Sequence, residues 1–408
     1  MRNIKVIRVI VSGFGAAGTT FLLQVFLSHQ LGLAEFGAYA AVTSILTVIA
    51  PFISIGISGL FLRRACVDQS QIGQLMPISI VCLLATTLLA YILSVLFLPG
   101  VSVVQSICLA TFYFPFALQN ITVASAQVKE RYNVVSVAQS VLPTVKLLIV
   151  LFSLFFLVNL TTVSYFIAAG HAIAFYVLLV LFKREFDYKK SADFNINLRE
   201  ISGFMKQSVF YALNGTVNVA QIQISTIVAV FLFGTAASGL YSSASTLLTA
   251  CFLLPNIVFG TYFLPKYHKM TTDLYSIKTP LKHAYVSFAV GLFAGLILFV
   301  LTPFVIKVVY PASFSSASAI LMILCLSIPL RFFSTALGAA ILSEESIPLK
   351  VAVSFLSIVI QAIFMYVLRG YGMQSLAMSY VISEFFVAAL YFMIYQRYVN
   401  MVRIKLAV

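Results

Sequence analysis

The sequence predicts an all-α polytopic membrane protein with about twelve transmembrane helices in two six-helix lobes. Three observations lead to this prediction: the composition, the even spacing of the apolar segments and an internal repeat. Of the 408 residues, 62% are hydrophobic and only 9% are charged, and the mean hydropathy is +1.06. Because a helix needs about 20 apolar residues to cross a bilayer core, the chain has room for about a dozen spans.

The apolar segments follow one another along the chain with short polar connections between them. Pro and Gly recur inside these segments, so their ends are less sharply defined than their number. The expected spans are residues 9–28, 36–61, 75–97, 102–126, 136–157, 162–182, 207–233, 237–263, 284–306, 314–341, 350–368 and 373–395.

The positions of Lys and Arg predict the orientation, because cytoplasmic connections carry an excess of basic residues. With these spans, 21 of the 25 basic residues fall on the side of the two termini, and the opposite side holds only Lys307 and Arg369. We therefore expect both termini in the cytoplasm. The net charge of +14 then reflects topology and attraction to an anionic leaflet, and we expect no nucleic-acid partner.

The first apolar segment is longer than the hydrophobic region of a signal peptide, and no small-residue cleavage pattern follows it. We expect it to be retained as a span. Of the five cysteines, four lie inside spans and Cys66 lies in a cytoplasmic connection, so we expect no disulfide, no metal site and no cofactor.

An internal repeat divides the chain into two halves. The segments 32–39 and 234–241 each contain two glycines five residues apart and then a tyrosine, at an offset of 202. A second register, at an offset of 214, pairs Pro115 with Pro329. Because each half has an even number of spans, both halves enter the membrane from the same side, as parallel repeats do.

The predicted domains are an N-terminal lobe at 1–183, a linker at 184–206 and a C-terminal lobe at 207–408. The linker is dense in charge, and its apolar residues alternate loosely with Arg199, Glu200 and Lys206. This pattern predicts an interfacial amphipathic helix that leads into the seventh span, with a simple cytoplasmic tether as the alternative.

Two cations lie inside long apolar runs and are the main candidates for a binding site. A charged side chain at bilayer depth costs roughly 2.5 to 3.5 kcal/mol, so it usually faces a protein interior or a wet cavity. Lys146 lies about ten residues, or roughly 15 Å, from the start of its span, shortly after Pro143, which is expected to kink the helix or free a carbonyl. Arg331 lies at similar depth after Pro329. Both are predicted to bind an anion, unless Lys146 snorkels to the interface.

Glu384 is the only acidic residue deep within a span, and His171 lies opposite it in the repeat at an offset of 213. Intramembrane Glu and His are common in proton relays, so both are candidates for coupling transport to protons. The alternatives are an ion pair between Glu384 and Arg331 and a hydrogen-bonded core histidine at 171.

One face of the seventh span carries amide and hydroxyl groups at helical spacing, from Asn214, Asn218, Gln221 and Ser225. This face is predicted to bind sugar hydroxyls or, alternatively, to form interhelical hydrogen bonds. Sparser polar groups of the same kind are Gln24 and Thr20 in the first span and Gln119 and Asn120 in the fourth. Gly13, Gly15 and Gly18 with their neighbouring alanines predict close helix contacts rather than a phosphate loop.

Several motifs together resemble a known family. They are the Leu-Gly-x-x-x-Phe-Gly-x-Tyr pattern at 31–39, its echo at 234–241, the Leu-Pro pairs at 254–255 and 264–265, and the start of the last span at 372–384. In these the chain resembles the Wzx-type polysaccharide flippases, which export O-antigen and capsule repeat units and are relatives of the multidrug and toxin extrusion (MATE) carriers. The resemblance covers nearly the whole chain and is specific for fold rather than for substrate.

The resemblance implies a location in a bacterial inner membrane and a V-shaped pair of lobes that alternates between inward-open and outward-open states. It implies as substrate an oligosaccharide linked to undecaprenyl pyrophosphate, with the polyprenyl tail left in membrane lipid. A polysaccharide polymerase and a chain-length regulator are its potential protein partners. Lys146 and Arg331 would then attract the pyrophosphate.

Three other classes of function compare less well with the sequence. An enzyme is not expected, because no large outward loop, paired carboxylates or nucleophile triad is present. A multidrug exporter of organic cations would need acidic residues in its cavity, and the first six spans contain none at depth. A structural scaffold would not require Lys146 or Arg331.

Overall fold

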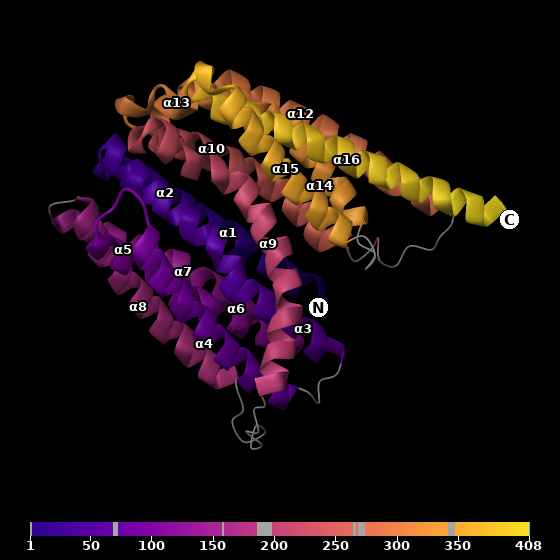
Figure 1. The fold of residues 1–408 in the computed structure, drawn as a ribbon, viewed down its shortest axis with the longest axis horizontal. Helices are drawn as coiled ribbons and strands as arrows, with labels where there is room; N and C mark the ends of the chain where they lie inside the picture. Colours follow the sequence, from indigo (N-terminus) through magenta and orange to yellow (C-terminus); the bar gives the residue numbers. More distant parts are fainter. Residues whose placement is uncertain are drawn as a thin grey trace. The chain divides into compact units, whose positions relative to one another are not determined.

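The computed structural model of the chain consists of helices joined by short turns in the residues that it describes, which are 2–67, 72–156, 159–185, 198–263, 267, 274–341 and 347–407. The chain divides into two compact units, Met1–Val219 and Ala220–Val408. Figure 1 shows the helices coloured along the sequence.

The first unit is a bundle in which α7 packs against α1, α6 and α8, and α8 also packs against α5 and α6. Its helices are α1 Arg2–Gln30, α2 Leu33–Ala50, the π-helical turn η1 Pro51–Ile55, α3 Gly56–Val67, α4 Ile72–Phe97, α5 Val103–Ala110, α6 Tyr113–Val128, α7 Tyr132–Phe152, the short 3₁₀ turn η3 Ser153–Phe155, α8 Leu160–Glu185 and the first part of α9 Leu198–Phe233.

The second unit has α14 at its centre, in contact with α10, α12 and α16, while α15 lies against α16 (Figure 1). Its helices are the last part of α9, then α10 Thr235–Ile257, the π-helical turn η5 Val258–Phe263, α12 Leu274–Val309, the 3₁₀ turn η6 Ala312–Phe314, α13 Ala317–Cys325, α14 Ser327–Ala340, α15 Ile347–Val367, the 3₁₀ turn η8 Arg369–Tyr371 and α16 Gln374–Ala407.

The chain is a multi-pass membrane protein. Among the described residues ten helices are long and apolar enough to cross a bilayer, or eleven when the bent pair α13 and α14 counts as one span. The remaining expected span, 207–233, lies within α9 and includes the shorter apolar helix Val219–Phe233. Large apolar side chains are exposed along α4, α12 and α15, where lipid would cover them.

Some predicted ends are wrong by several residues. The fifth span ends as an α-helix at Phe152 rather than at 157, and it begins at Tyr132 rather than at 136. Pro143 lies inside this helix, which continues past it without a break. In the expected linker, residues 186–197 lie outside the described residues. From Leu198 onward one helix runs to Phe233, so residues 198–206 and the seventh span form a single element.

The fourth helix of each half is interrupted at equivalent positions. The break falls at Thr111 and Phe112 between α5 and α6, and at Leu326 between α13 and α14, where the axis bends by 42°. Pro115 and Pro329 follow at the same 214-residue offset. Because proline has no N–H, the carbonyl four residues earlier loses its α-helical partner, and the chain tightens into i to i+3 bonds such as Phe114 N to Thr111 O at 3.2 Å.

The second helix of each half contains a π-helical turn near a proline. One is η1, which begins at Pro51, and the other is η5, which follows Pro255. The first is braced by its neighbours: Thr86 of α4 donates to the Ile53 carbonyl at 3.1 Å, and Asn120 of α6 donates to Ser54 Oγ at 3.2 Å. The repeat in the sequence is thus a repeat of irregular helices.

Close helix contacts occur at glycines other than those expected. A Cβ at Gly56 of α3 would lie 2.6 Å from the Ser208 carbonyl of α9, and one at Gly291 of α12 would lie 2.8 Å from Phe332 of α14. A Cβ at Gly13, Gly15 or Gly18 would meet nothing within 4 Å, so the prediction of close contacts there is wrong for this structure. Small residues permit close approach but do not require it.

Candidate functional site

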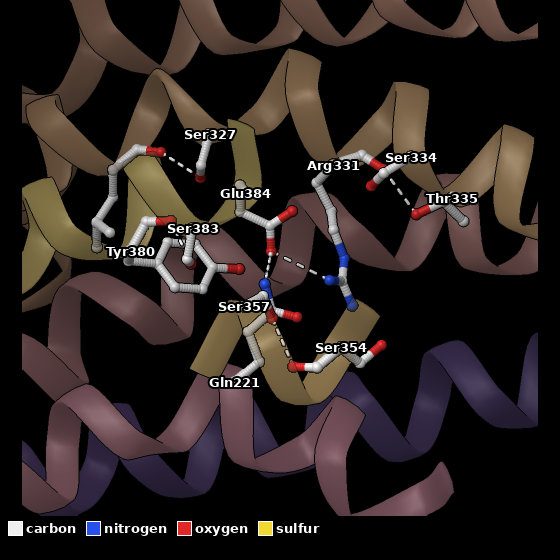
Figure 2. A network of polar contacts seen from close by, with 11 residues as sticks. Gln221, Ser327, Arg331, Ser334, Thr335, Ser354, Ser357, Tyr380, Ser383 and Glu384 are labelled. Carbon is white, nitrogen blue, oxygen red and sulfur yellow. Dashed lines mark hydrogen bonds and ion pairs between the residues drawn. The ribbon is translucent and has the colours of Figure 1, made fainter. Parts of the chain in front are cut away.

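Among the described residues, two membrane-spanning helices of the second unit are joined by an ion pair between Arg331 and Glu384. Arg331 of α14 donates from Nη1 to Glu384 Oε1 of α16 at 3.1 Å, and the same oxygen accepts from Gln221 Nε2 of α9 at 3.1 Å. Figure 2 shows the Glu384 carboxylate with both donors reaching one oxygen. The glutamate side chain is fully buried, whereas 13% of the arginine side chain remains exposed.

The local helix geometry explains the positions of Arg331, Tyr380 and Glu384. The break at Leu326 is followed by α14, in which the hydroxyls of Ser334 and Thr335 donate to the Arg331 carbonyl at 3.2 and 2.7 Å (Figure 2). Tyr380 and Glu384 are one turn apart on α16 and therefore share a face. The Tyr380 hydroxyl points toward the carboxylate in Figure 2.

The rest of the amide face of α9 is tied into the same unit. Ser225 Oγ accepts from Gln361 Nε2 of α15 at 3.0 Å and lies 3.5 Å from the Leu376 carbonyl of α16. Gln221 and Ser225 are both buried. These two members of the predicted sugar-binding face therefore form interhelical hydrogen bonds in this state of the protein, which is the alternative raised by the sequence.

Several atoms of this network have no hydrogen-bond partner among the described residues. They are Glu384 Oε2, Arg331 Nε, the Tyr380 hydroxyl and Gln361 Oε1, all buried. An unpaired buried polar group costs about 1 to 3 kcal/mol, so a structural core would normally satisfy it. The network is incomplete in the way that a binding or switching site often is.

Lys146 occupies a different environment in the first unit. Its side chain is half-buried, and its ammonium lies 5.8 Å from the centre of the Phe112 ring, at the break between α5 and α6. The ammonium forms no hydrogen bond or ion pair with another described residue. Gly170 of α8 lies against the Lys146 backbone, which brings α7 and α8 close at this depth.

His171 lies on the other side of the same phenylalanine, with ring centres 6.0 Å apart. Its Nδ1 is 2.8 Å from Thr111 Oγ1, and that hydroxyl donates its proton to the Cys108 carbonyl at 2.6 Å. With the hydroxyl in this orientation, His171 Nδ1 is the donor and Nε2 is left as an acceptor. Nε2 is buried and has no hydrogen-bond partner among the described residues.

The other predicted residues are dispersed. The side chains of Asn214 and Asn218 lie outside the described residues, although their backbone belongs to α9. Gln24 is half-buried in α1, and Thr20 donates to the Ala16 carbonyl of its own helix. Asn120 braces the η1 turn, and Gln119 has a buried amide oxygen without a partner among the described residues.

The sequence did not single out the aromatic neighbours of the two cations. Arg331 lies 5.7 Å from the centre of the Phe252 ring, much as Lys146 lies near Phe112. A cation over an aromatic face gains about 0.5 to 2 kcal/mol without a carboxylate. Pro115 and Pro329 were the sequence signal that could have located these surroundings. Each proline follows a helix break, and Lys146 and Arg331 lie beside those breaks.

The fold is that of a known class of transporters. It matches a multidrug resistance MATE family transporter of the MOP superfamily in an inward-facing conformation, with a TM-score of 0.70 at 13% identity over 97% of this chain and 95% of that one. It matches the lipid II flippase MurJ in an inward closed conformation with a TM-score of 0.72 at 13% identity over 95% and 87%. A MOP superfamily transporter from Pyrococcus furiosus, described as having a binding pocket of reverse polarity, gives 0.65 at 14% identity over 98% and 96%.

These likenesses define a helical membrane transporter fold with the architecture expected from the sequence. The chain belongs to the family of polysaccharide biosynthesis proteins, whose model matches residues 4–267. No curated protein matches the chain. The family resemblance found in the motifs is confirmed.

Proposed function

We propose that this protein is a flippase that carries an oligosaccharide linked to undecaprenyl pyrophosphate from the cytoplasmic to the outer leaflet by alternating access. The membership in the polysaccharide biosynthesis family and the transporter fold support a flippase-like transporter. O-antigen, other lipopolysaccharide and capsule repeat units all fit the proposal. A polysaccharide polymerase and a chain-length regulator would act on the delivered unit.

The observation that carries the proposal is the charge balance at bilayer depth. Lys146 has no carboxylate beside it in the described part of the chain, and the carboxylate of Glu384 is already paired with Arg331. The remaining charge is positive, which favours an anionic substrate. A pyrophosphate diester provides that charge, and guanidinium and ammonium groups are its usual ligands in proteins.

Glu384 and His171 are the proposed coupling residues. Both are buried and both have an unpaired atom that can accept a proton, Oε2 and Nε2. Protonation of either changes the charge of its unit, and a change of charge at this depth would alter the relative free energies of the transport states. Gln24, Asn214 and Asn218 remain proposed sugar contacts, together with Gln221 and Ser225 in states where their present bonds open.

The test is deletion of the gene in its own host, with surface polysaccharide and lipid-linked glycan measured together. Loss of surface polymer with accumulation of single lipid-linked repeat units on the cytoplasmic leaflet is the expected result. Complementation by the wild-type gene is the control. Normal polymer with new sensitivity to cationic drugs would instead indicate a multidrug exporter, the alternative that the MATE relatives represent.

A further inference from the structure

The ion pair between Arg331 and Glu384 differs in geometry from the pair between Arg131 and Glu185. The pair between Arg131 and Glu185 near the membrane surface uses both carboxylate oxygens, each 3.0 Å from Nη1. The pair between Arg331 and Glu384 uses one oxygen, which is shared with Gln221. The second oxygen of Glu384 and the Nε of Arg331 are buried and have no partner among the described residues.

The two atoms without a partner are a hydrogen-bond acceptor, Glu384 Oε2, and a hydrogen-bond donor, Arg331 Nε. Nε of a guanidinium belongs to the edge that binds two oxygens of a carboxylate or phosphate in parallel. Arg331 therefore has a buried donor that Glu384 does not use and that a bidentate anion could bind after the glutamate is displaced. The arginine is 13% exposed whereas the glutamate is fully buried, so an incoming anion reaches the arginine first.

The carboxylate has other groups to receive it once it is released. Gln221 already donates to it, and the Tyr380 hydroxyl points toward it and has no partner among the described residues (Figure 2). An amide and a hydroxyl can solvate a displaced carboxylate or a protonated one. The network thus has a second arrangement in which Arg331 is free and Glu384 stays buried.

We propose that Glu384 is a built-in competitor of the substrate, whose carboxylate occupies Arg331 until the pyrophosphate group displaces it. This inference rests on the proposed function and adds its regulation. Only a ligand that interacts with Arg331 more strongly than a single carboxylate displaces the glutamate. The site therefore discriminates against monovalent anions and carboxylates and selects the more highly charged pyrophosphate.

The test is binding of inorganic pyrophosphate and of farnesyl pyrophosphate to the full-length purified protein in detergent, measured by calorimetry. Glu384→Gln keeps the size and hydrogen bonding of the side chain and removes its charge. We expect it to bind both probes about tenfold more tightly than the wild type, because the anion no longer has to displace a carboxylate. We expect no measurable acetate binding by the wild type and measurable acetate binding by this variant.

Two further variants link the effect to Arg331. The double variant Glu384→Gln with Arg331→Gln removes both charges and leaves neither unpaired, so it should fold and lose the tightened binding. Tyr310→Phe is the matched control: it removes another buried hydrogen bond of the second unit, from Tyr310 to the Ser243 carbonyl at 3.2 Å, away from Arg331. Its affinity for pyrophosphate should equal that of the wild type.

Equal or weaker pyrophosphate binding by folded Glu384→Gln would overturn the proposal. If that variant does not fold, Tyr380→Phe replaces it, since the Tyr380 hydroxyl has no partner among the described residues in the present arrangement and would receive the carboxylate only after displacement. Weaker pyrophosphate binding by this variant supports the proposal, and unchanged or tighter binding overturns it. A wild-type protein that binds pyrophosphate independently of both Arg331 and Lys146 would contradict the anion site of the proposed function itself. A wild type that binds through Arg331 without tightening in Glu384→Gln would contradict this inference alone.

Discussion

At the scale of single residues, the free-energy cost of burying the two intramembrane cations is offset by different contacts. Arg331 has a carboxylate and a phenylalanine, whereas Lys146 has only the face of Phe112 among the described residues. A lone ammonium inside a membrane-spanning helix is energetically costly, so its presence is best explained by a ligand that pairs with it during transport. Lys146 is thus the residue whose charge should matter most.

Charge reversal at Lys146 tests this directly. We expect Lys146→Glu to abolish export of repeat units, because the substrate and the new carboxylate repel each other, while Lys146→Arg retains part of the activity. The measurement is surface polysaccharide in a deletion strain that expresses each variant at equal protein level. Full export by Lys146→Glu would remove this residue from the binding site.

We expect the Phe112 ring to support transport by stabilising the Lys146 ammonium. Phe112→Leu keeps an apolar side chain, although a smaller one, and loses the ring face, worth about 0.5 to 2 kcal/mol, so export should fall severalfold. Phe112→Tyr keeps the ring and should restore most of it. The thermal stability of the purified variants is measured as well, because it separates an effect on the position of Lys146 from a general loss of packing. Equal export by the leucine and tyrosine variants would show that the ring face is dispensable.

At the scale of elements, the irregular parts of the helices coincide with the polar groups. The breaks at Phe112 and Leu326 lie beside Lys146 and His171 in one unit and near Arg331 in the other, and the π-helical turn at Pro51–Ile55 is held by Thr86 and Asn120. Transporters commonly place binding sites at such discontinuous helices, where freed backbone groups face a cavity.

The contact between α3 and α9 should depend on the absence of a side chain at Gly56. A Cβ there would lie 2.6 Å from the Ser208 carbonyl and 2.8 Å from the Ala212 Cβ, and backbone cannot move aside cheaply. We expect Gly56→Val to destabilise the protein by about 1 to 3 kcal/mol or more, seen as a lower thermal unfolding midpoint in detergent.

The control for this prediction lies on α9 itself. Gly203 has nothing within 4 Å of an added Cβ, so Gly203→Ala should leave the midpoint unchanged or raise it slightly. If Gly56→Val unfolded at the same temperature as Gly203→Ala, the two helices would not be packed as closely as the structure shows.

The sequence predicted the spans well because apolar length is a local property that composition alone determines. It also aligned Pro115 with Pro329 and so located both breaks without identifying them as breaks. It could not predict that Glu384 would use one oxygen for both Arg331 and Gln221, because that depends on the packing of three helices from distant parts of the chain. For the same reason it placed close contacts at Gly13 rather than at Gly56.

At the scale of the whole molecule, the distribution of basic residues predicts the orientation of the chain in the membrane. Of the 25 basic residues, 21 fall on one predicted side, and attraction of such residues to the cytoplasmic leaflet is the strongest sequence determinant of topology. The direction of export depends on this orientation, since a lipid-linked substrate made on the cytoplasmic leaflet must enter from that side. Orientation is therefore part of the proposed function.

Single cysteines labelled from outside the cell test the orientation. In a variant that lacks the five native cysteines, Ser313→Cys, in the connection after the ninth span, should react with a membrane-impermeant maleimide in intact cells. Lys206→Cys, at the start of the seventh span, should react only after the membrane is opened. Both side chains are exposed in the structure, so failure to react reports sidedness rather than burial. The reverse pattern would place the termini outside the cell. The proposed flippase would then have to load its substrate from the outer leaflet. That result would contradict the proposed direction of transport, even if Lys146 and Arg331 bind pyrophosphate.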